Sequence, residues 1–189
     1  MSTSVAAKGA LRREAGTHAV ELKQGVTASV KAREIVLKGP NGSATKAFQR
    51  IPVDIEVKGN QVVITPFTGK KKDVISANTV SSIVRALVHG VTKGYEYRMK
   101  VVFAHFPVTV KVKDDQVVIE NFMGERSPRL AKILGGCKVS TEGDDIIIKG
   151  TSLEQIGQTA ANVEQATRIK RKDQRIFLDG IYVYQKKRN

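Results

Sequence analysis

The chain repeats its own pattern at a distance of about 82 residues. The apolar run 35–37 recurs as 117–119, and the segment 59–64 recurs as 143–148 at a distance of 84. Each half then ends in a helical pattern. Because the same features recur in the same order, the sequence predicts a domain that has been duplicated.

A second self-alignment, at a distance of 55 residues, is locally stronger. It places 51–53 on 106–108 and 61–64 on 116–119. It pairs hairpins that occupy different positions in the two halves, however, and it leaves the helices unaligned. We therefore prefer the collinear alignment.

Alternating apolar and charged side chains mark the strands. Residues 53–58 alternate in this way, and a Gly59-Asn60 turn leads to the β-branched run 62–64. This pattern predicts a β-hairpin with one buried face. The same pattern recurs over 108–119, around Asp114-Asp115.

Two stretches have the apolar spacing of a helix. The first begins near Ser76. The second begins near Thr151-Ser152, where Ser152 and Gln155 have the spacing of a capping box. The predicted fold class is therefore α+β, with two similar domains from an internal duplication, each a mainly antiparallel sheet packed against one helix.

Four segments follow from these patterns. We expect a flexible N-terminal arm over 1–22, a first α+β domain over 23–94, a second over 95–175 and a basic C-terminal tail over 176–189. The apolar runs are too short for a membrane helix or a secretory signal. The Ser, Ala and Arg content of the arm also fits a mitochondrial presequence, but a flexible arm is the preferred interpretation.

The charge of the chain predicts a polyanionic partner. The formal net charge is +14 and the pI is about 10.0. This favours nucleic acid, ahead of an anionic membrane or a glycosaminoglycan. Residues 95–167 carry 9 Lys and Arg against 10 Asp and Glu, whereas 168–189 carry 8 against 2. A neutral body with a basic extension is typical of a nucleic-acid-binding module.

The sequence offers no catalytic or metal-binding motif. The three histidines, His18, His89 and His105, lack partners at the spacing of metal ligands or catalytic groups. The single Cys137 excludes an internal disulfide, favours a reducing compartment and is expected to be inert. We therefore expect neither an enzyme nor a bound metal or cofactor.

Several basic stretches are candidate RNA contacts. Gly39-Pro40-Asn41-Gly42 matches the G-x-x-G loop of some RNA-binding modules, although a hairpin turn is the commoner structure for such a sequence. The run Lys70–Lys72 is expected in a loop before the first helix, either as solvated surface or as a phosphate contact. A Pro-containing connection over 124–132 places three cations where they suit an RNA groove.

The C-terminal stretch interleaves cations with aromatic residues, which suits phosphate neutralisation combined with stacking. Phe177, Ile181 and Val183 also fit a terminal strand on the second domain, and both interpretations can hold together. The predicted RNA-binding residues are Lys70, Lys71, Lys72, Arg126, Arg129, Lys132, Arg168, Lys170, Arg171, Lys172, Arg175, Tyr182, Lys186, Lys187 and Arg188.

Certain residues also carry a family resemblance. They are Gln165, Ile169, Lys172, Arg175, Phe177, 179–183 and Lys186, with 90–100, 104–107 and 121–125 upstream. In order and spacing they resemble the large ribosomal subunit protein six family in its eukaryotic form, called protein nine in the eukaryotic numbering. The resemblance covers roughly residues 25–186.

The resemblance implies a structural constituent of the cytosolic large ribosomal subunit that supports translation. It implies binding to large-subunit rRNA near the sarcin–ricin loop and stalk base, through 126–132, 168–175 and the final lysines. Neighbouring ribosomal proteins would be partners, elongation factors would dock nearby, no membrane would be involved, and assembly would pass through the nucleolus. Two other functions stay open: a free RNA chaperone or regulator, and an enzyme acting on RNA.

Overall fold

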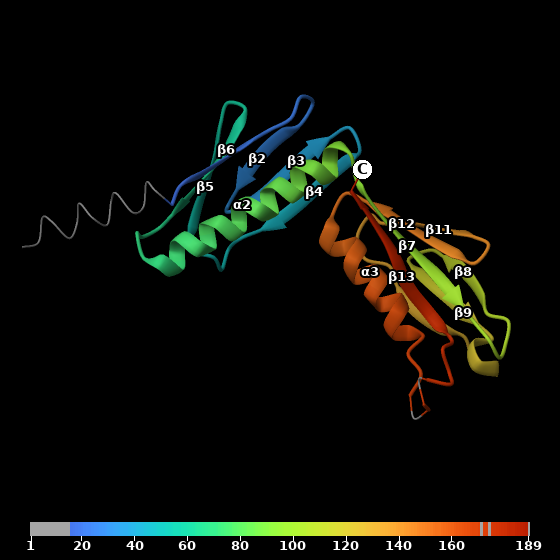
Figure 1. Cartoon of the computed structure of the whole chain (residues 1–189). Helices are drawn as coiled ribbons and strands as arrows, with labels where there is room; N and C mark the ends of the chain where they lie inside the picture. Colours follow the sequence, from blue (N-terminus) through green and yellow to red (C-terminus); the bar gives the residue numbers. More distant parts are fainter. Residues whose placement is uncertain (1–15, 171, 174, 189) are drawn as a thin grey trace, which may run out of the picture. The chain divides into compact units, whose positions relative to one another are not determined.

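The computed structural model describes residues 16–170, 172–173 and 175–188. The chain divides into two compact units, one up to Thr92 and one from Lys93 onward, and each is described by itself (Figure 1).

The first unit has two antiparallel sheets and one long helix. One sheet has the order β2-β3-β4 and the other β1-β6-β5. The elements are β1 (His18–Glu21), β2 (Thr27–Lys31), β3 (Glu34–Gly39), β4 (Gly42–Ala47), β5 (Val53–Lys58), β6 (Gln61–Pro66) and α2 (Lys71–Thr92).

Helix α2 supplies the centre of the first core. Its apolar stripe is buried against strands of both sheets (Figure 1). Val80, Val84 and Val91 are completely buried there, together with Ile35 and Ile64 from the strands. By length and composition alone α2 is apolar enough to cross a membrane. Its apolar stripe is instead the inner face of a core helix.

The second unit repeats this plan with additions. Its sheets have the orders β10-β9-β8 and β11-β12-β7-β13, and all pairs are antiparallel. The elements are β7 (Tyr95–Val102), β8 (Thr109–Lys113), β9 (Gln116–Glu120), the short 3-10 helix η1 (Phe122–Gly124), β10 (Arg129–Lys132), β11 (Lys138–Glu142), β12 (Asp145–Gly150), α3 (Leu153–Ala166) and β13 (Gly180–Arg188).

The strand order confirms the duplication and its collinear alignment. Strands β2 and β3 correspond to β8 and β9, the hairpin β5–β6 corresponds to β11–β12, and β1 beside β6 corresponds to β7 beside β12. The alignment at a distance of 55 is wrong, because it equates the β5–β6 hairpin of one sheet with the β8–β9 hairpin of the other. The predicted α+β class is also confirmed.

One predicted segment needs correction, and another contains the terminal strand that the sequence also suggests. The expected arm over 1–22 is not an arm at its inner end, since β1 pairs with β6 and both Val20 and Leu22 are buried. The rest of that arm, up to residue 15, lies outside the described residues. The expected tail over 176–189 contains β13, which pairs with β7 from end to end, with a register shift at Val183/Gln185.

The first helix begins earlier than its apolar spacing predicts. Helix α2 starts at Lys71, so Lys71 and Lys72 belong to its first turn rather than to a loop. The Thr68 hydroxyl donates to the Asp73 carboxylate at this end. The first turn is polar and faces solvent, which is why an apolar stripe beginning near Ser76 does not reveal it. The second helix begins as predicted, and the Ser152 hydroxyl accepts from the Gln155 amide.

The Gly39–Gly42 turn packs against the end of α2. The Asn41 amide donates to the Val91 carbonyl at 3.0 Å, and the Asn41 side chain donates to the Thr92 carbonyl, also at 3.0 Å. Carbonyls in the last turn of a helix have no partner within the helix, so these bonds complete the helix end. The G-x-x-G sequence is thus a hairpin turn with a structural role.

Replacing Gly39 with alanine tests this packing. The added Cβ would lie 2.6 Å from the Val91 carbonyl oxygen, and a backbone atom cannot give way as a side chain can. Urea unfolding of Gly39→Ala should show a loss of about 1–3 kcal/mol in the free energy of unfolding. Gly157→Ala is the control, because nothing lies within 4 Å of its Cβ, and it should leave stability equal or higher. Equal stability of Gly39→Ala and the wild type would contradict the close packing.

Candidate RNA-binding surface

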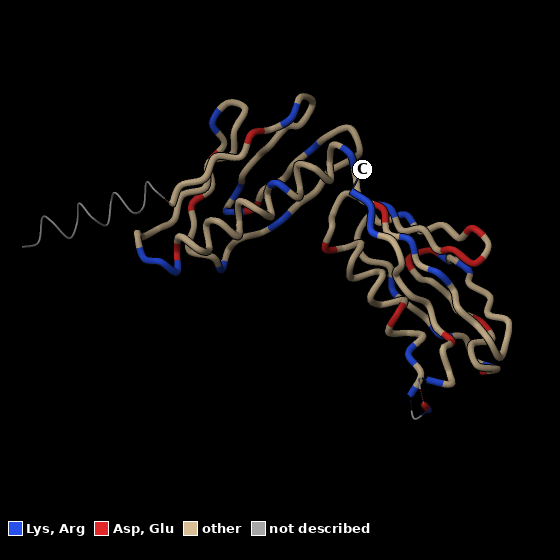
Figure 2. The backbone as a smooth tube through the Cα atoms, viewed as in Figure 1, with Lys and Arg blue, Asp and Glu red and all other residues tan. Residues whose placement is uncertain are grey.

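Residues 167–179 join α3 to β13 and are called the basic segment. This is the most basic exposed connection of the second unit (Figure 2). Arg168, Lys170, Lys172 and Arg175 are all exposed on it. Arg171, predicted with them, lies outside the described residues. The structure therefore gathers most of this predicted group on one connection.

Thr167 ties the start of this segment to the sheet. Its buried hydroxyl accepts from the Ile181 amide at 3.2 Å and donates to the Glu164 carbonyl at 3.1 Å. The end of α3 and the beginning of β13 are therefore held by one side chain.

Arg129 on β10 also binds the backbone at the start of the basic segment. Its guanidinium makes a two-point ion pair with Glu125, at 2.6 and 2.8 Å. Its third nitrogen donates to the carbonyls of Ala166 at 2.9 Å and Arg168 at 3.3 Å. The group also lies 4.4 Å from the centre of the Phe122 ring. The hydrogen bonds from Arg129 hold the pKa of Glu125 below its usual range.

Arg129, which the sequence predicts as an RNA contact, binds groups of the protein itself. The planar, five-donor guanidinium suits bidentate binding, and here it binds protein acceptors. Arg126 and Lys132, predicted in the same stretch, are exposed. The Lys132 carbonyl accepts from the Asn162 side chain at 2.9 Å, which ties β10 to α3. Arg129 thereby joins the 126–132 stretch to the 168–175 stretch.

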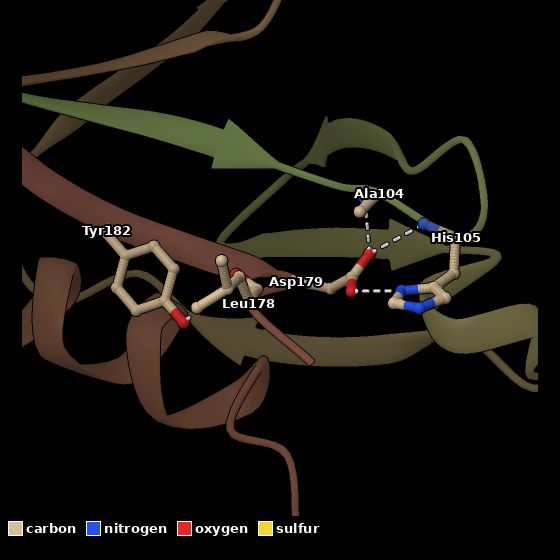
Figure 3. A network of polar contacts seen from close by, with 5 residues as sticks. All are labelled: Ala104, His105, Leu178, Asp179 and Tyr182. Carbon is tan, nitrogen blue, oxygen red and sulfur yellow. Dashed lines mark hydrogen bonds and ion pairs between the residues drawn. The ribbon is translucent and has the colours of Figure 1, made fainter. Parts of the chain in front are cut away.

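Asp179 fixes the far end of the basic segment (Figure 3). One carboxylate oxygen accepts from the backbone amides of Ala104 at 2.7 Å and His105 at 3.3 Å. The other lies 2.8 Å from Nδ1 of the His105 ring. Burial raises the pKa of the Asp179 carboxyl, but these donors together outweigh burial, and the pKa lies below its usual range.

His105 connects Asp179 to Phe177 in the basic segment. Its ring stacks on Phe177 with 4.9 Å between ring centres and 25° between planes. The Lys172 ammonium lies 4.8 Å from the centre of the same Phe177 ring, a cation–π distance. The basic segment is therefore held at its start by Thr167 and Arg129, and at its end by Asp179 and His105.

The role of the Asp179–His105 pair is not apparent from the sequence. The two residues are separated by 74 positions, and a single histidine has no sequence spacing that would indicate its partner. The available signal is indirect: both residues fall within stretches that carry the family resemblance.

The remaining predicted residues of the second unit lie on β13. Tyr182 is 45% exposed, and its hydroxyl donates to the Leu178 carbonyl at 3.5 Å. The Lys186 ammonium lies 5.5 Å from the centre of the Tyr97 ring. Lys187 is half-buried and Arg188 is exposed at the end of the strand.

Lys70, Lys71 and Lys72 form a second basic group in the first unit (Figure 2). All three are exposed at the N-terminus of α2. The partial positive charge of a helix N-terminus adds to theirs, and such ends bind phosphate groups readily.

Metal ligands and reactive thiols are the remaining chemistry to consider in the described part of the chain. Among the described residues, no three His, Cys, Asp or Glu side chains are grouped as metal ligands. Burial raises the pKa of the Cys137 thiol, which disfavours the reactive thiolate. The predicted residues described above form an exposed, basic surface.

Replacing Asp179 with asparagine should weaken this anchor. The variant loses the charge that accepts three hydrogen bonds in a buried place, so urea unfolding at pH 7 should show a loss of about 1–3 kcal/mol. Asp173→Asn is the matched control, since Asp173 is an exposed carboxylate of the same segment. Equal losses in the two variants would contradict the anchor.

The low pKa of Asp179 also predicts a pH dependence. A carboxyl whose pKa is lower in the folded chain than in the unfolded chain, where it is about 3.9, stabilises the fold above the unfolded value. That contribution disappears as the pH falls through the folded pKa. Unfolding measured from pH 7 to pH 3 should show stability falling below about pH 4, and falling less in Asp179→Asn.

Comparison with known proteins identifies the family. The model for ribosomal protein L6 matches residues 23–94 and 106–180, one segment in each unit. A large ribosomal subunit protein uL6 from Methanobrevibacter smithii is 48% identical over 168 residues, covering 88% of this chain and 94% of the relative. Proteins of the same name from Ignicoccus hospitalis and Methanosarcina mazei are 44% and 43% identical over 87% and 88% of this chain, and 91% and 95% of their own lengths. The predicted family is confirmed, and the eukaryotic form fits within it. With both units matched and these relatives covered over almost their entire length, the chain belongs to the ribosomal protein L6 family.

Proposed function

We propose that this chain binds large-subunit rRNA near the sarcin–ricin loop and the stalk base, and fixes neighbouring RNA helices in place. Membership of the ribosomal protein L6 family makes it a structural, non-enzymatic constituent of the large ribosomal subunit. The particular rRNA site is our proposal, and it rests on the family resemblance together with the surface of the second unit.

The observation that carries the proposal is the anchored basic segment after α3. Four exposed cations lie on a connection that Arg129 and Thr167 hold at one end and Asp179 at the other. Because its two ends are already held, this segment would lose less conformational entropy when RNA binds, so more of the electrostatic attraction remains as affinity.

Other predicted residues extend the contact. Arg126 and Lys132 lie in the stretch that Arg129 joins to the segment, and Lys186 and Arg188 are exposed on β13. We propose that these contact phosphates of the same RNA. Lys187 is half-buried and contributes through its charge. The three lysines at the N-terminus of α2 would hold a further phosphate group.

We assign Arg129 a positioning role within this surface. Its donors are directed to Glu125, Ala166 and Arg168. It would therefore support RNA binding by holding the backbone from which Arg168 extends.

The partners follow from the proposed location. Large-subunit rRNA comes first, followed by the ribosomal proteins near the stalk base, with elongation factors docking nearby. The protein would act on cytoplasmic ribosomes, and we propose nucleolar assembly for a chain of the eukaryotic form.

A free RNA chaperone using the same surface is the second candidate. Sedimentation of the tagged chain from cell extract through a high-salt sucrose gradient separates the two functions. We expect stable co-migration with large subunits and polysomes. A chain that remains at the top of the gradient would identify a free RNA binder and contradict the structural role.

The anchored segment predicts a specific change in salt dependence. Lys170→Ala/Lys172→Ala should weaken binding to deproteinised large-subunit rRNA from Methanobrevibacter smithii, measured by filter binding from about 50 to 200 mM salt. The slope of log K against log salt should become shallower by about one for each phosphate that the variant no longer neutralises.

A variant with the same change in charge provides the control. Lys113 and Lys138 are exposed on β8 and β11 of the same unit, and neither belongs to the basic segment. Lys113→Ala/Lys138→Ala should retain a steeper slope. Identical slopes in the two double variants would show that net charge, not the anchored segment, governs binding.

A further inference from the structure

A cavity of about 580 Å³ lies between the C-terminal end of α3 and the start of β13. Glu164, Gln165 and Arg168 line it from the helix end, and Leu178 and Tyr182 line it from the opposite side. Its volume falls in the range of sites that bind small molecules or parts of larger ligands. Membership of the ribosomal protein L6 family does not specify what this cavity binds.

The residues that line the cavity are of two chemical kinds, apolar and polar. Tyr182 presents an aromatic ring and Leu178 an aliphatic side chain, while Glu164 and Gln165 present a carboxylate and an amide. An unstacked nucleobase has the matching properties, since its faces are apolar and its edge carries hydrogen-bond donors and acceptors.

Positive charge lies in the lining of the cavity and close to it. Arg168 lines it, the Lys172 ammonium lies 4.8 Å from the ring centre of the lining residue Phe177, and Lys170 is exposed on the segment that continues from Arg168. A nucleotide whose base enters the cavity leaves its phosphates outside, beside these cations. An apolar protein side chain would use the cavity but leave this arrangement of charge without a function.

The cavity is shaped before any ligand arrives. Thr167 and Asp179 both line it, and both are buried and hydrogen-bonded to other elements. The Tyr182 hydroxyl donates to the Leu178 carbonyl, which limits the rotation of the ring (Figure 3). A preformed cavity of this kind favours binding because little has to be ordered.

We propose that this cavity receives one unstacked nucleobase of the bound rRNA, stacked on Tyr182 and read along its edge by Glu164 and Gln165. The inference rests on the proposed rRNA binding and adds base recognition to it. A carboxylate accepts hydrogen bonds only, so the cavity should prefer a base with an amino group on its edge. Guanine fits best, because adjacent imino and amino groups can both donate to one carboxylate.

Variants of Tyr182 distinguish the contribution of stacking to rRNA binding from that of electrostatic attraction. In the full chain, Tyr182→Ala should weaken binding to deproteinised Methanobrevibacter smithii large-subunit rRNA about tenfold. The slope against log salt should stay as in the wild type, because every cation that neutralises a phosphate is still present. Tyr182→Phe keeps the ring and should bind nearly as the wild type does.

Tyr184 provides the matched control on the same strand. It is 52% exposed, does not line the cavity, and donates its hydroxyl to Asp145 at 3.1 Å. Tyr184→Ala should leave rRNA affinity unchanged. Thermal unfolding of both alanine variants checks that each is folded at the temperature of the assay.

Ultraviolet crosslinking followed by mass spectrometry identifies the occupant directly. In the wild type, the peptide containing Tyr182 should carry a crosslinked guanine nucleotide, and Glu164→Gln should broaden the range of bases found there. Failure of the full chain to bind rRNA at all would overturn the proposed function itself.

Two other results would overturn the cavity inference and leave rRNA binding intact. One is equal rRNA affinity in Tyr182→Ala and Tyr184→Ala. The other is a crosslink from Tyr182 to a ribosomal protein in assembled subunits, which would show that a protein side chain occupies the cavity.

Discussion

The buried carboxylate of Asp179 determines the course of the chain between α3 and β13. It accepts hydrogen bonds from the backbone amides of Ala104 and His105, which follow β7, and lies beside Nδ1 of His105, so it joins the start of the last strand and the basic segment to this turn. A buried charge without such donors would be strongly destabilising. Because the donors are present, a connection rich in like charges is fixed at its Asp179 end. The exposed cations, Phe177 and the neighbouring cavity all depend on this arrangement.

The two units show how a duplicated domain acquires a binding surface. In the first unit, β3 and β4 are joined by the tight Gly39–Gly42 turn, which completes the end of α2. In the second, the corresponding connection is longer and contains Phe122 and Arg126, and the helix is followed by the basic segment and an added strand. The core of the second copy keeps the plan of the first, while its connections carry the function, as is common for loops on a rigid scaffold.

Features that depend on neighbours close in sequence could be predicted, whereas features that depend on distant partners could not. The hairpin around Gly59-Asn60 and the Ser152 cap depend on neighbours a few residues apart, and both follow from local pattern. The predicted family is confirmed, whereas the RNA contacts of individual residues remain proposals. The roles of Arg129 and Asp179 depend on partners 37 and 75 residues away, which no local pattern reveals. Strand β1 escapes prediction because four residues with one buried side chain give too short an alternation.

Strand β13 lies at the edge of its sheet and has a further consequence for the protein before it meets RNA. An edge strand of nine residues is a template on which another chain can add a strand, leading to aggregation. Here the final residues of that edge include Lys186, Lys187 and Arg188, and the register is shifted at Val183/Gln185. Charge and irregularity of this kind oppose pairing between copies, so the residues proposed to contact RNA also keep newly made chains apart.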